Sequence, residues 1–123
     1  ERVMVVGDAA HALVPHQGAG AGQALEDAYV LATLLTDVRC DHRRVSDVLA
    51  AFEHVRHART CRAQRTSHAA GDVYEYSGKG IGGDESKLIH DLENRFDWLW
   101  NHDPHDDVIA ARQYLETVSR DRL

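Results

Sequence analysis

Close to its start the chain carries a short apolar run, Val3 to Val6, that stops abruptly at Gly7-Asp8. An uninterrupted apolar run of this length is typical of a β-strand buried on both faces of a sheet. Such a strand needs neighbouring strands, and the remaining sequence offers few strand candidates. We therefore expect the chain to be a piece of a larger α/β protein.

Composition narrows the class of protein. The chain has 123 residues, 43% of them apolar and 28% charged, which suits one small soluble domain. Its formal charge of −6 provides no general attraction to nucleic acid or to an anionic membrane, and no apolar run is long enough to span a bilayer. Cys40 and Cys61 form neither a CxxC pair nor a disulfide framework. We expect reduced thiols, a cytoplasmic protein, and no nucleic-acid or membrane partner.

Apolar residues at helical spacing predict about four helices after the strand. The first follows the glycines of 18–22 and reaches about Thr36, and the second opens with Ser46 as its N-cap and continues to about Tyr76. A glycine-rich loop precedes a third helix over 84–101, and Pro104 begins a fourth. The predicted fold is mainly α, with one N-terminal strand followed by about four helices.

The segment from Arg2 to Ala28, RVMVVGDAAHALVPHQGAGAGQALEDA, concentrates the features that could bind a ligand. Asp8 ends the predicted strand, so its carboxylate is placed at the carboxyl edge of a sheet, where it could accept hydrogen bonds from sugar-like hydroxyls. The glycines of 18–22 let backbone N–H groups approach a ligand at a helix N-terminus. That end carries partial positive charge and unpaired donors, and it would stabilise an anion or an electron-rich carbonyl.

This string closely resembles the second flavin-binding motif of the single-component (class A) FAD-dependent aromatic hydroxylases, which share the para-hydroxybenzoate hydroxylase fold. The Pro-His-Gln-Gly-Ala-Gly-Ala-Gly-Gln sequence is most similar to the salicylate hydroxylase branch, and the Arg56 region and Trp98 to Asp103 resemble it more loosely. The resemblance implies that the chain is the C-terminal part of such an enzyme. Its predicted elements would then be a fragment of an α/β FAD-binding, glutathione-reductase-like fold.

The resemblance also implies residue roles. It places Asp8 on the ribityl chain of FAD, Pro15 beside the isoalloxazine, and the backbone N–H groups of Ala21 and Gly22 at the flavin O2 edge. His16 adjoins the proline and is a candidate substrate contact. The full expected cofactor-binding set is Gly7, Asp8, Pro15, Gly18, Ala19, Gly20, Ala21 and Gly22. We expect no catalytic side chain and no metal ligand in this chain, because FAD supplies the oxygen chemistry and the protein orients it.

The division of the chain follows from this picture. Residues 1–36 are expected to form a flavin-contacting strand, loop and helix, and 37–123 a C-terminal helical region, within one incomplete domain. The family's FAD-binding βαβ fingerprint and its middle sheet are not found here, so the expected partner is that missing N-terminal portion. The expected reaction is hydroxylation of a phenolic acid such as salicylate with O2 and NADH or NADPH. The isolated chain should hold FAD poorly and be inactive.

Two other functions remain open. The chain could be a non-enzymatic helical remnant that forms a homo-oligomer through its Ala-rich first helix and Trp98/Trp100. A less favoured possibility is a His-rich metal-binding module built on His54, His57 and Cys61, or on the HDPHDD stretch of 102–107.

Four further features have less specific interpretations. Gly78 to Gly83 matches GxGxxG, but no buried strand precedes it and Asp84-Glu85 would repel a pyrophosphate, so we expect a flexible loop. The arginines at 56, 59, 62 and 65 are expected to form salt bridges with the rest of a parent protein. Glu26 and Asp27 are expected to be structural or surface groups, and His11 structural.

Overall fold

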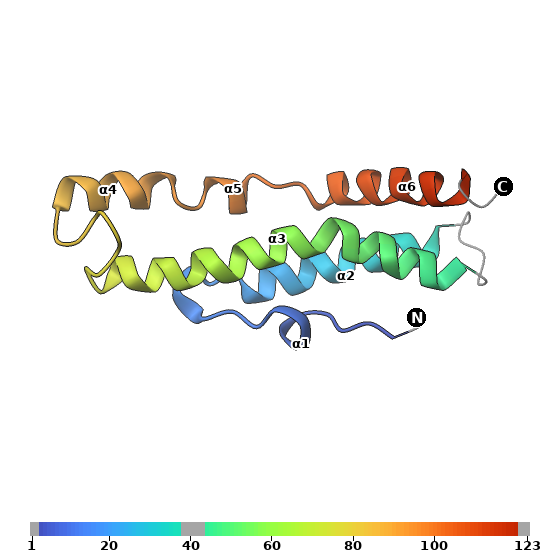
Figure 1. Ribbon diagram of the computed structural model, residues 1–123, viewed down its shortest axis with the longest axis horizontal. Coiled ribbons are helices and arrows are strands. Elements are labelled where there is room, and N and C mark those ends of the chain that lie inside the picture. Colours follow the sequence, from blue (N-terminus) through green and yellow to red (C-terminus); the bar gives the residue numbers. More distant parts are fainter. Residues whose placement is uncertain (1–2, 38–43, 121–123) are drawn as a thin grey trace.

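The computed structural model describes residues 3–37 and 44–120, and three long helices dominate them. Helix α3 (Val45–Tyr74) runs antiparallel to α2 (Gly20–Thr36) and to α6 (Pro104–Arg120), and all three pack against one another (Figure 1). The N-terminal segment, with the short helix α1 (Asp8–His11) and the 3-10 turn η1 (Pro15–Gln17), lies against α3 on the side away from α6. Helices α4 (Glu85–Asn94) and α5 (Asp97–Trp100) continue the line of α6 along α3.

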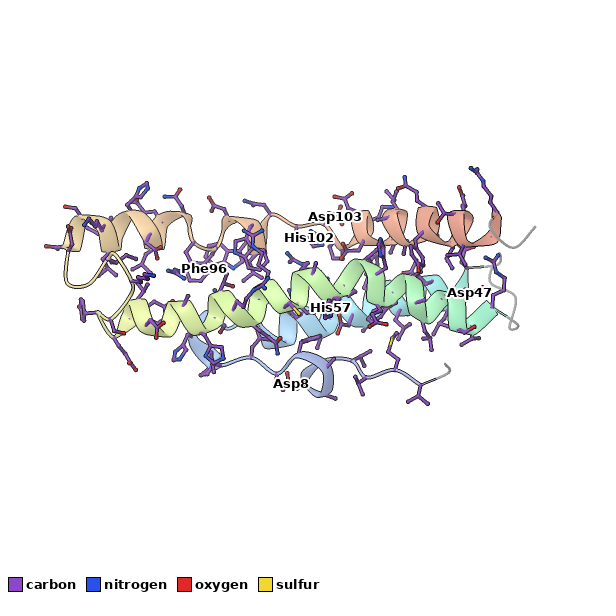
Figure 2. All side chains as sticks on the ribbon, in the orientation of Figure 1. Asp8, Asp47, His57, Phe96, His102 and Asp103 are labelled. Carbon is purple, nitrogen blue, oxygen red and sulfur yellow. The ribbon has the colours of Figure 1, made fainter. Side chains whose placement is uncertain are left out.

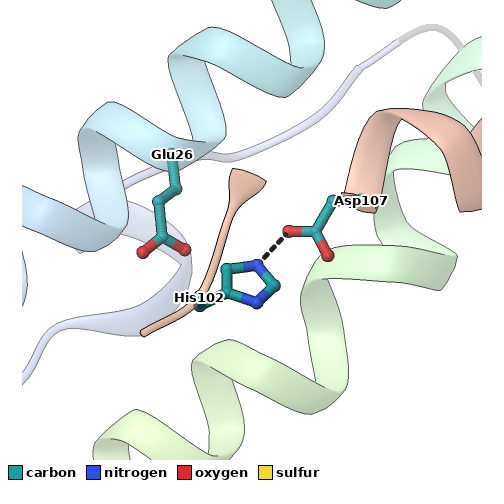
Figure 3. Close-up of side chains that lie close together, drawn as sticks. All are labelled: Glu26, His102 and Asp107. Carbon is teal, nitrogen blue, oxygen red and sulfur yellow. Dashed lines mark hydrogen bonds and ion pairs between the residues drawn. The ribbon is translucent and has the colours of Figure 1, made fainter. Parts of the chain in front are cut away.

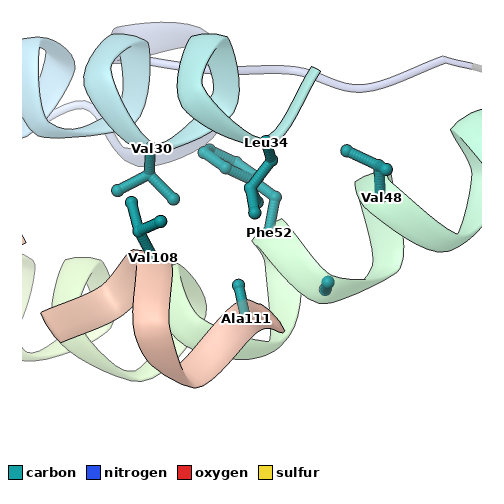
Figure 4. Close-up of a cluster of buried hydrophobic side chains, with 7 residues drawn as sticks. Val30, Leu34, Val48, Phe52, Val108 and Ala111 are labelled. Carbon is teal, nitrogen blue, oxygen red and sulfur yellow. The ribbon is translucent and has the colours of Figure 1, made fainter. Parts of the chain in front are cut away.

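One apolar core joins the three long helices (Figure 4). Leu34 from α2 and Phe52 from α3 are 2% and 5% exposed, and Val108 from α6 is fully buried. The small side chains of Ala51 and Ala111 allow the helix backbones to approach closely in the same cluster. Because the core takes residues from both predicted parts of the chain, 1–36 and 37–123 are packed as one unit.

The predicted N-terminal strand is wrong for this structure. Residues 3–6 have an extended backbone, but no residue within 3–37 or 44–120 pairs with them as a strand. Val3 is 84% and Val5 60% exposed, whereas Met4 packs against the core of helices. A strand exists only through hydrogen bonds to a neighbouring strand, and the described chain supplies none.

The predicted helices are largely confirmed, with two corrections. The first helix ends at Thr36 and the last begins at Pro104, as predicted. The second begins one residue before Ser46, which therefore lies inside the first turn, and Arg44 holds the N-cap position without a side-chain cap. The prediction that Ser46 caps this helix is wrong.

The third predicted helix, over 84–101, is divided into α4 and α5. Asp84 caps α4 by accepting the Lys87 N–H at 3.1 Å. The guanidinium of Arg59 then takes the carbonyls of Trp98 and Leu99, at 3.3 and 3.1 Å, so these acceptors are occupied where a longer helix would need them. Cys40 and the rest of 38–43, like Arg2, lie outside the described residues. No helix in the described part of the chain is long and apolar enough to cross a membrane.

Candidate functional site

The site begins with a tight turn at Gly7 to His11. Gly7 has a positive φ of 59°, and its carbonyl accepts the N–H groups of Ala10 and His11, both at 2.9 Å. The Gly7 N–H donates to Asp27 Oδ2 at 3.0 Å, which fastens the turn to α2. Asp8, the first residue of α1, stays exposed on the outer side of the N-terminal segment (Figure 2).

The Asp8 carboxylate lies next to the start of α2. A β-carbon added to Gly20 would come within 3.9 Å of Asp8 Oδ1. Helix α2 has no side-chain cap, so its first N–H groups are available beside this carboxylate. A hydrogen-bond acceptor and a row of backbone donors therefore lie side by side.

Glycines leave the space around this helix start open. Gly18 has a left-handed φ of 60° and donates its N–H to the Pro15 carbonyl at 3.0 Å, which turns the chain from η1 into α2. A β-carbon at Gly18 or Gly22 would meet no atom within 4 Å. Pro15 and Ala21 are also exposed, whereas the Ala19 side chain is buried. Apart from Ala19, the expected cofactor-binding positions are accessible to a ligand.

His16 packs on the far part of α3. Its ring meets the Tyr74 ring edge-on, with centroids 6.2 Å apart, and occupies the space beside Gly71. A glycine within a long helix weakens it, and here the glycine makes room for the imidazole. His16 itself is exposed, next to exposed Pro15.

Behind the turn lies a buried ion pair between Asp27 and Arg56. Asp27 Oδ1 accepts from Arg56 Nε at 2.9 Å, and Asp27 Oδ2 contacts His11 Nε2 at 2.5 Å. Both side chains of the ion pair are no more than 3% exposed. Burial alone would raise the pKa of Asp27, but hydrogen bonds from His11, Arg56 and the Gly7 backbone outweigh it and hold this pKa below its usual value. Asp27 is therefore ionised, and the His11 ring donates to it.

Arg56 connects Asp27 to two further carboxylates. Its Nη1 donates to Glu26 at 2.6 Å and to Asp107 of α6 at 3.0 Å. Burial opposes the charge of Glu26, but hydrogen bonds and Coulomb attraction from Arg59 and Arg56 lower its pKa. The same carboxylates raise the pKa of Arg56 against the effect of its own burial. The expectation of structural roles for Glu26, Asp27 and His11 agrees with this network.

The arginine stripe pairs within the chain, not with a missing partner. Arg59 donates to both oxygens of Glu26, each at 2.7 Å. The Arg62 guanidinium lies 4.1 Å from the centre of the Trp98 ring, a cation–π contact. For Arg56 and Arg59, the predicted salt bridges to the rest of a parent protein are therefore wrong. Sequence reasoning missed these partners because they lie 29 to 51 residues away along the chain.

The group that resembles a metal site differs from the predicted ones. Glu26, His102 and Asp107 have ligand atoms within 4.8 Å of one another, and His102 Nε2 lies 3.0 Å from Asp107 Oδ2 (Figure 3). Two arginines, however, already neutralise the carboxylates of Glu26 and Asp107. Of the predicted helix-face set, His57 lies near Cys61, while His54 stacks on Tyr114. The described residues thus give the metal hypothesis no unoccupied ligand set.

The glycine-rich segment at 78–83 is a series of turns, as predicted. Gly80 and Gly82 have φ values of 81° and 53°, and the Gly78 carbonyl accepts the N–H groups of Ile81 and Gly82. Asp84 caps the helix that follows, so its carboxylate already occupies the position a phosphate would need. This geometry disfavours a second nucleotide site.

Taken together, an acidic residue beside an uncapped, glycine-lined helix start defines a wall suited to a polar, partly anionic cofactor. A family model described as "FAD binding domain" matches residues 1–67, more than half of the chain, and the chain belongs to this family.

Relatives and a solved structure agree with this assignment. A salicylate hydroxylase of Pseudomonas putida is 50% identical over 114 residues, covering 93% of this chain, and a 6-methylsalicylate 1-monooxygenase of Aspergillus terreus is 43% identical over 102 residues, covering 82%. A structure titled "Salicylate hydroxylase substrate complex" superposes with a TM-score of 0.83 at 45% identity over 89% of this chain. The chain spans about a quarter of these proteins, 26%, 22% and 27% of their lengths. It is thus homologous to a part of FAD-dependent monooxygenases.

Proposed function

We propose that this chain forms one wall of the FAD site in a monooxygenase that hydroxylates a phenolic acid such as salicylate, with O2 and with NADH or NADPH as transient reductant. The observation that carries the proposal is the Asp8 carboxylate lying beside the uncapped start of α2, in a member of an FAD-binding family. The names of the relatives support the substrate class.

The residues divide the work of binding. The Asp8 carboxylate accepts hydrogen bonds from ribityl hydroxyls, and Pro15 lies beside the isoalloxazine. The N–H groups of Ala21 and Gly22 donate to the flavin O2 edge, because a helix N-terminus stabilises negative charge there. The remaining members of the set, Gly7, Gly18, Ala19 and Gly20, shape the backbone. When bound, FAD supplies the activation of oxygen, and the chain orients it.

The exposed His16 contacts the aromatic acid in this proposal, next to Pro15. Residues 37–123 hold the flavin-contacting part, 1–36, in place through the shared core. The other FAD contacts and most of the aromatic pocket come from an N-terminal portion of a longer, cytoplasmic enzyme. The 123-residue chain alone therefore binds FAD weakly and does not hydroxylate.

Two substitutions in the full-length protein test the flavin wall. Asp8→Ala removes an exposed carboxylate, so we expect weaker FAD binding with unchanged stability. Gly22→Ala fills open space on a helix, so we expect stability to rise by about 1 kcal/mol while FAD affinity falls. FAD affinity is measured by fluorescence titration, and stability by urea denaturation.

Gly83→Ala is the matched control, since a β-carbon there also meets no atom within 4 Å but the residue lies in the loop before α4. It should leave FAD affinity unchanged. Unaltered affinity in both Asp8→Ala and Gly22→Ala would refute the proposed wall.

Self-association remains a second candidate because α2 exposes apolar side chains. Leu25 is 71% and Leu35 45% exposed, and Trp100 of α5 is 71% exposed. Such surface needs a cover, which is either the rest of a longer enzyme or a second copy. Light scattering on the 123-residue chain separates the two, because a monomer at all concentrations would contradict self-association.

A further inference from the structure

We propose that Asp27, held in place by Arg56, is a positioning residue that fixes the flavin-contacting turn at Gly7 to His11 onto the three-helix core. This inference rests on the proposed flavin site and adds a residue that does not itself touch the cofactor. It makes the C-terminal helices α3 and α6 part of the flavin site's support.

One oxygen of Asp27 holds both ends of the turn. Oδ2 accepts the Gly7 N–H at 3.0 Å and also contacts His11 Nε2. Residues 7 and 11 bracket Asp8, whose carboxylate faces the start of α2. The turn itself is otherwise exposed at Ala9 and Ala10. The position of Asp8 therefore depends on where Asp27 Oδ2 is held.

The other oxygen is fixed by the core. Oδ1 accepts from Arg56 Nε, and Arg56 Nη2 donates to the side-chain oxygen of Gln23 at 3.1 Å. Arg56 also binds Asp107, which brings α6 into the arrangement. A guanidinium with fixed donor directions, itself 2% exposed, allows the carboxylate little freedom to rotate.

The number of donors explains why the residue is an aspartate. Three donors converge on it, from Gly7, His11 and Arg56, and an ionised carboxylate accepts all three on two oxygens. Asparagine has nearly the same shape but one acceptor oxygen, and its amide would point N–H groups at at least one of these donors. Asp27→Asn therefore loosens the turn without leaving a cavity.

The test uses the full-length protein with the Asp27→Asn substitution. We expect amide hydrogen exchange at Ala10 and His11 to become at least tenfold faster in the FAD-free protein, while protection of α6 amides is kept. We also expect the FAD dissociation constant to rise about tenfold and the absorption bands of the bound flavin to shift. Arg56→Lys, which keeps the charge but loses the fork of donors, should move each readout less in the same direction. It also serves as the second variant if Asp27→Asn fails to fold.

Leu34→Ala is the control, because it weakens the same core at a residue that does not touch the turn. It should lower stability yet leave exchange at Ala10 and His11 and the FAD dissociation constant within twofold of the parent. Unchanged exchange and FAD affinity in Asp27→Asn would overturn the inference. If the unsubstituted protein binds no FAD, the proposed function fails, whereas the exchange measurement still decides whether Asp27 positions the turn.

Discussion

The imidazole of His16 occupies the space that a side chain at Gly71 would need. A β-carbon at residue 71 would lie 2.7 Å from both Cδ2 and Nε2 of the ring, well inside contact distance. The contact joins η1, at the start of the glycine-rich segment, to the far end of α3. The position of His16 is thus set by a residue 55 positions later in the chain.

Gly71→Ala should displace the His16 ring. The atoms in the way belong to the end of a side chain, which can rotate, so the protein should still fold, with α3 gaining up to about 1 kcal/mol in helix propensity. If His16 contacts the aromatic acid as proposed, the KM for salicylate in the full-length enzyme should rise severalfold. Steady-state kinetics at saturating FAD measures this, and Gly83→Ala is the matched control. An unchanged KM would argue against a substrate contact by His16.

Local patterns predicted the helices well, because each long helix carries an apolar stripe and a recognisable stop. Pro104 starts α6, and the polar residues after Thr36 end α2, as the sequence indicates. The strand at Val3 to Val6 could not be confirmed in the same way. Its formation depends on neighbouring strands, and the exposed Val3 and Val5 meet none in the described chain.

The candidate site was predicted from one continuous motif, but its support was not. Asp8 and the glycines lie within 15 residues of one another, so their proximity follows from one turn. Asp27 meets Arg56 only because α2 and α3 pack together, and Asp107 joins them from α6. A residue that is charged in the sequence can be exposed or buried, and only the packing of three helices decides which.

Arg56→Met should strongly destabilise the protein. The change leaves Asp27 and Glu26 without their main counter-charge in a buried site, for which a loss of about 3–5 kcal/mol is typical. Urea denaturation of the 123-residue chain measures the loss. The matched control is Arg65→Met, since Arg65 is exposed on the same helix and should cost under about 1 kcal/mol. Equal losses in the two variants would contradict a buried network centred on Arg56.

Gly18→Ala should destabilise the protein through its backbone alone. Gly18 has a φ of 60°, and a β-carbon there meets no atom, so crowding makes no contribution. Placing alanine in the left-handed region costs about 1 kcal/mol. Gly18→Asn should cost less, because asparagine tolerates this region better. Thermal or urea denaturation should rank the parent above Gly18→Asn and Gly18→Ala last, and any other order would contradict the left-handed turn.

Acid should weaken the fold through Glu26 and Asp27, whose pKa values are both lowered in the folded state by their arginine and hydrogen-bond partners, against the opposing effect of burial. A carboxyl whose folded pKa lies below its unfolded pKa binds its proton more readily when unfolded. Its contribution is therefore complete above the unfolded values of about 4 and is lost as pH falls through the lower folded values. The free energy of unfolding should stay flat for these two groups from about pH 7 to pH 5 and decline below about pH 4. Urea denaturation between pH 2 and pH 7 measures the slope. Glu26→Gln should flatten the acid decline, whereas Glu93→Gln, at an exposed residue of α4, should leave it as in the parent. Identical slopes for the two variants would show that the acid sensitivity arises elsewhere than in the pairing of Glu26 with Arg56 and Arg59.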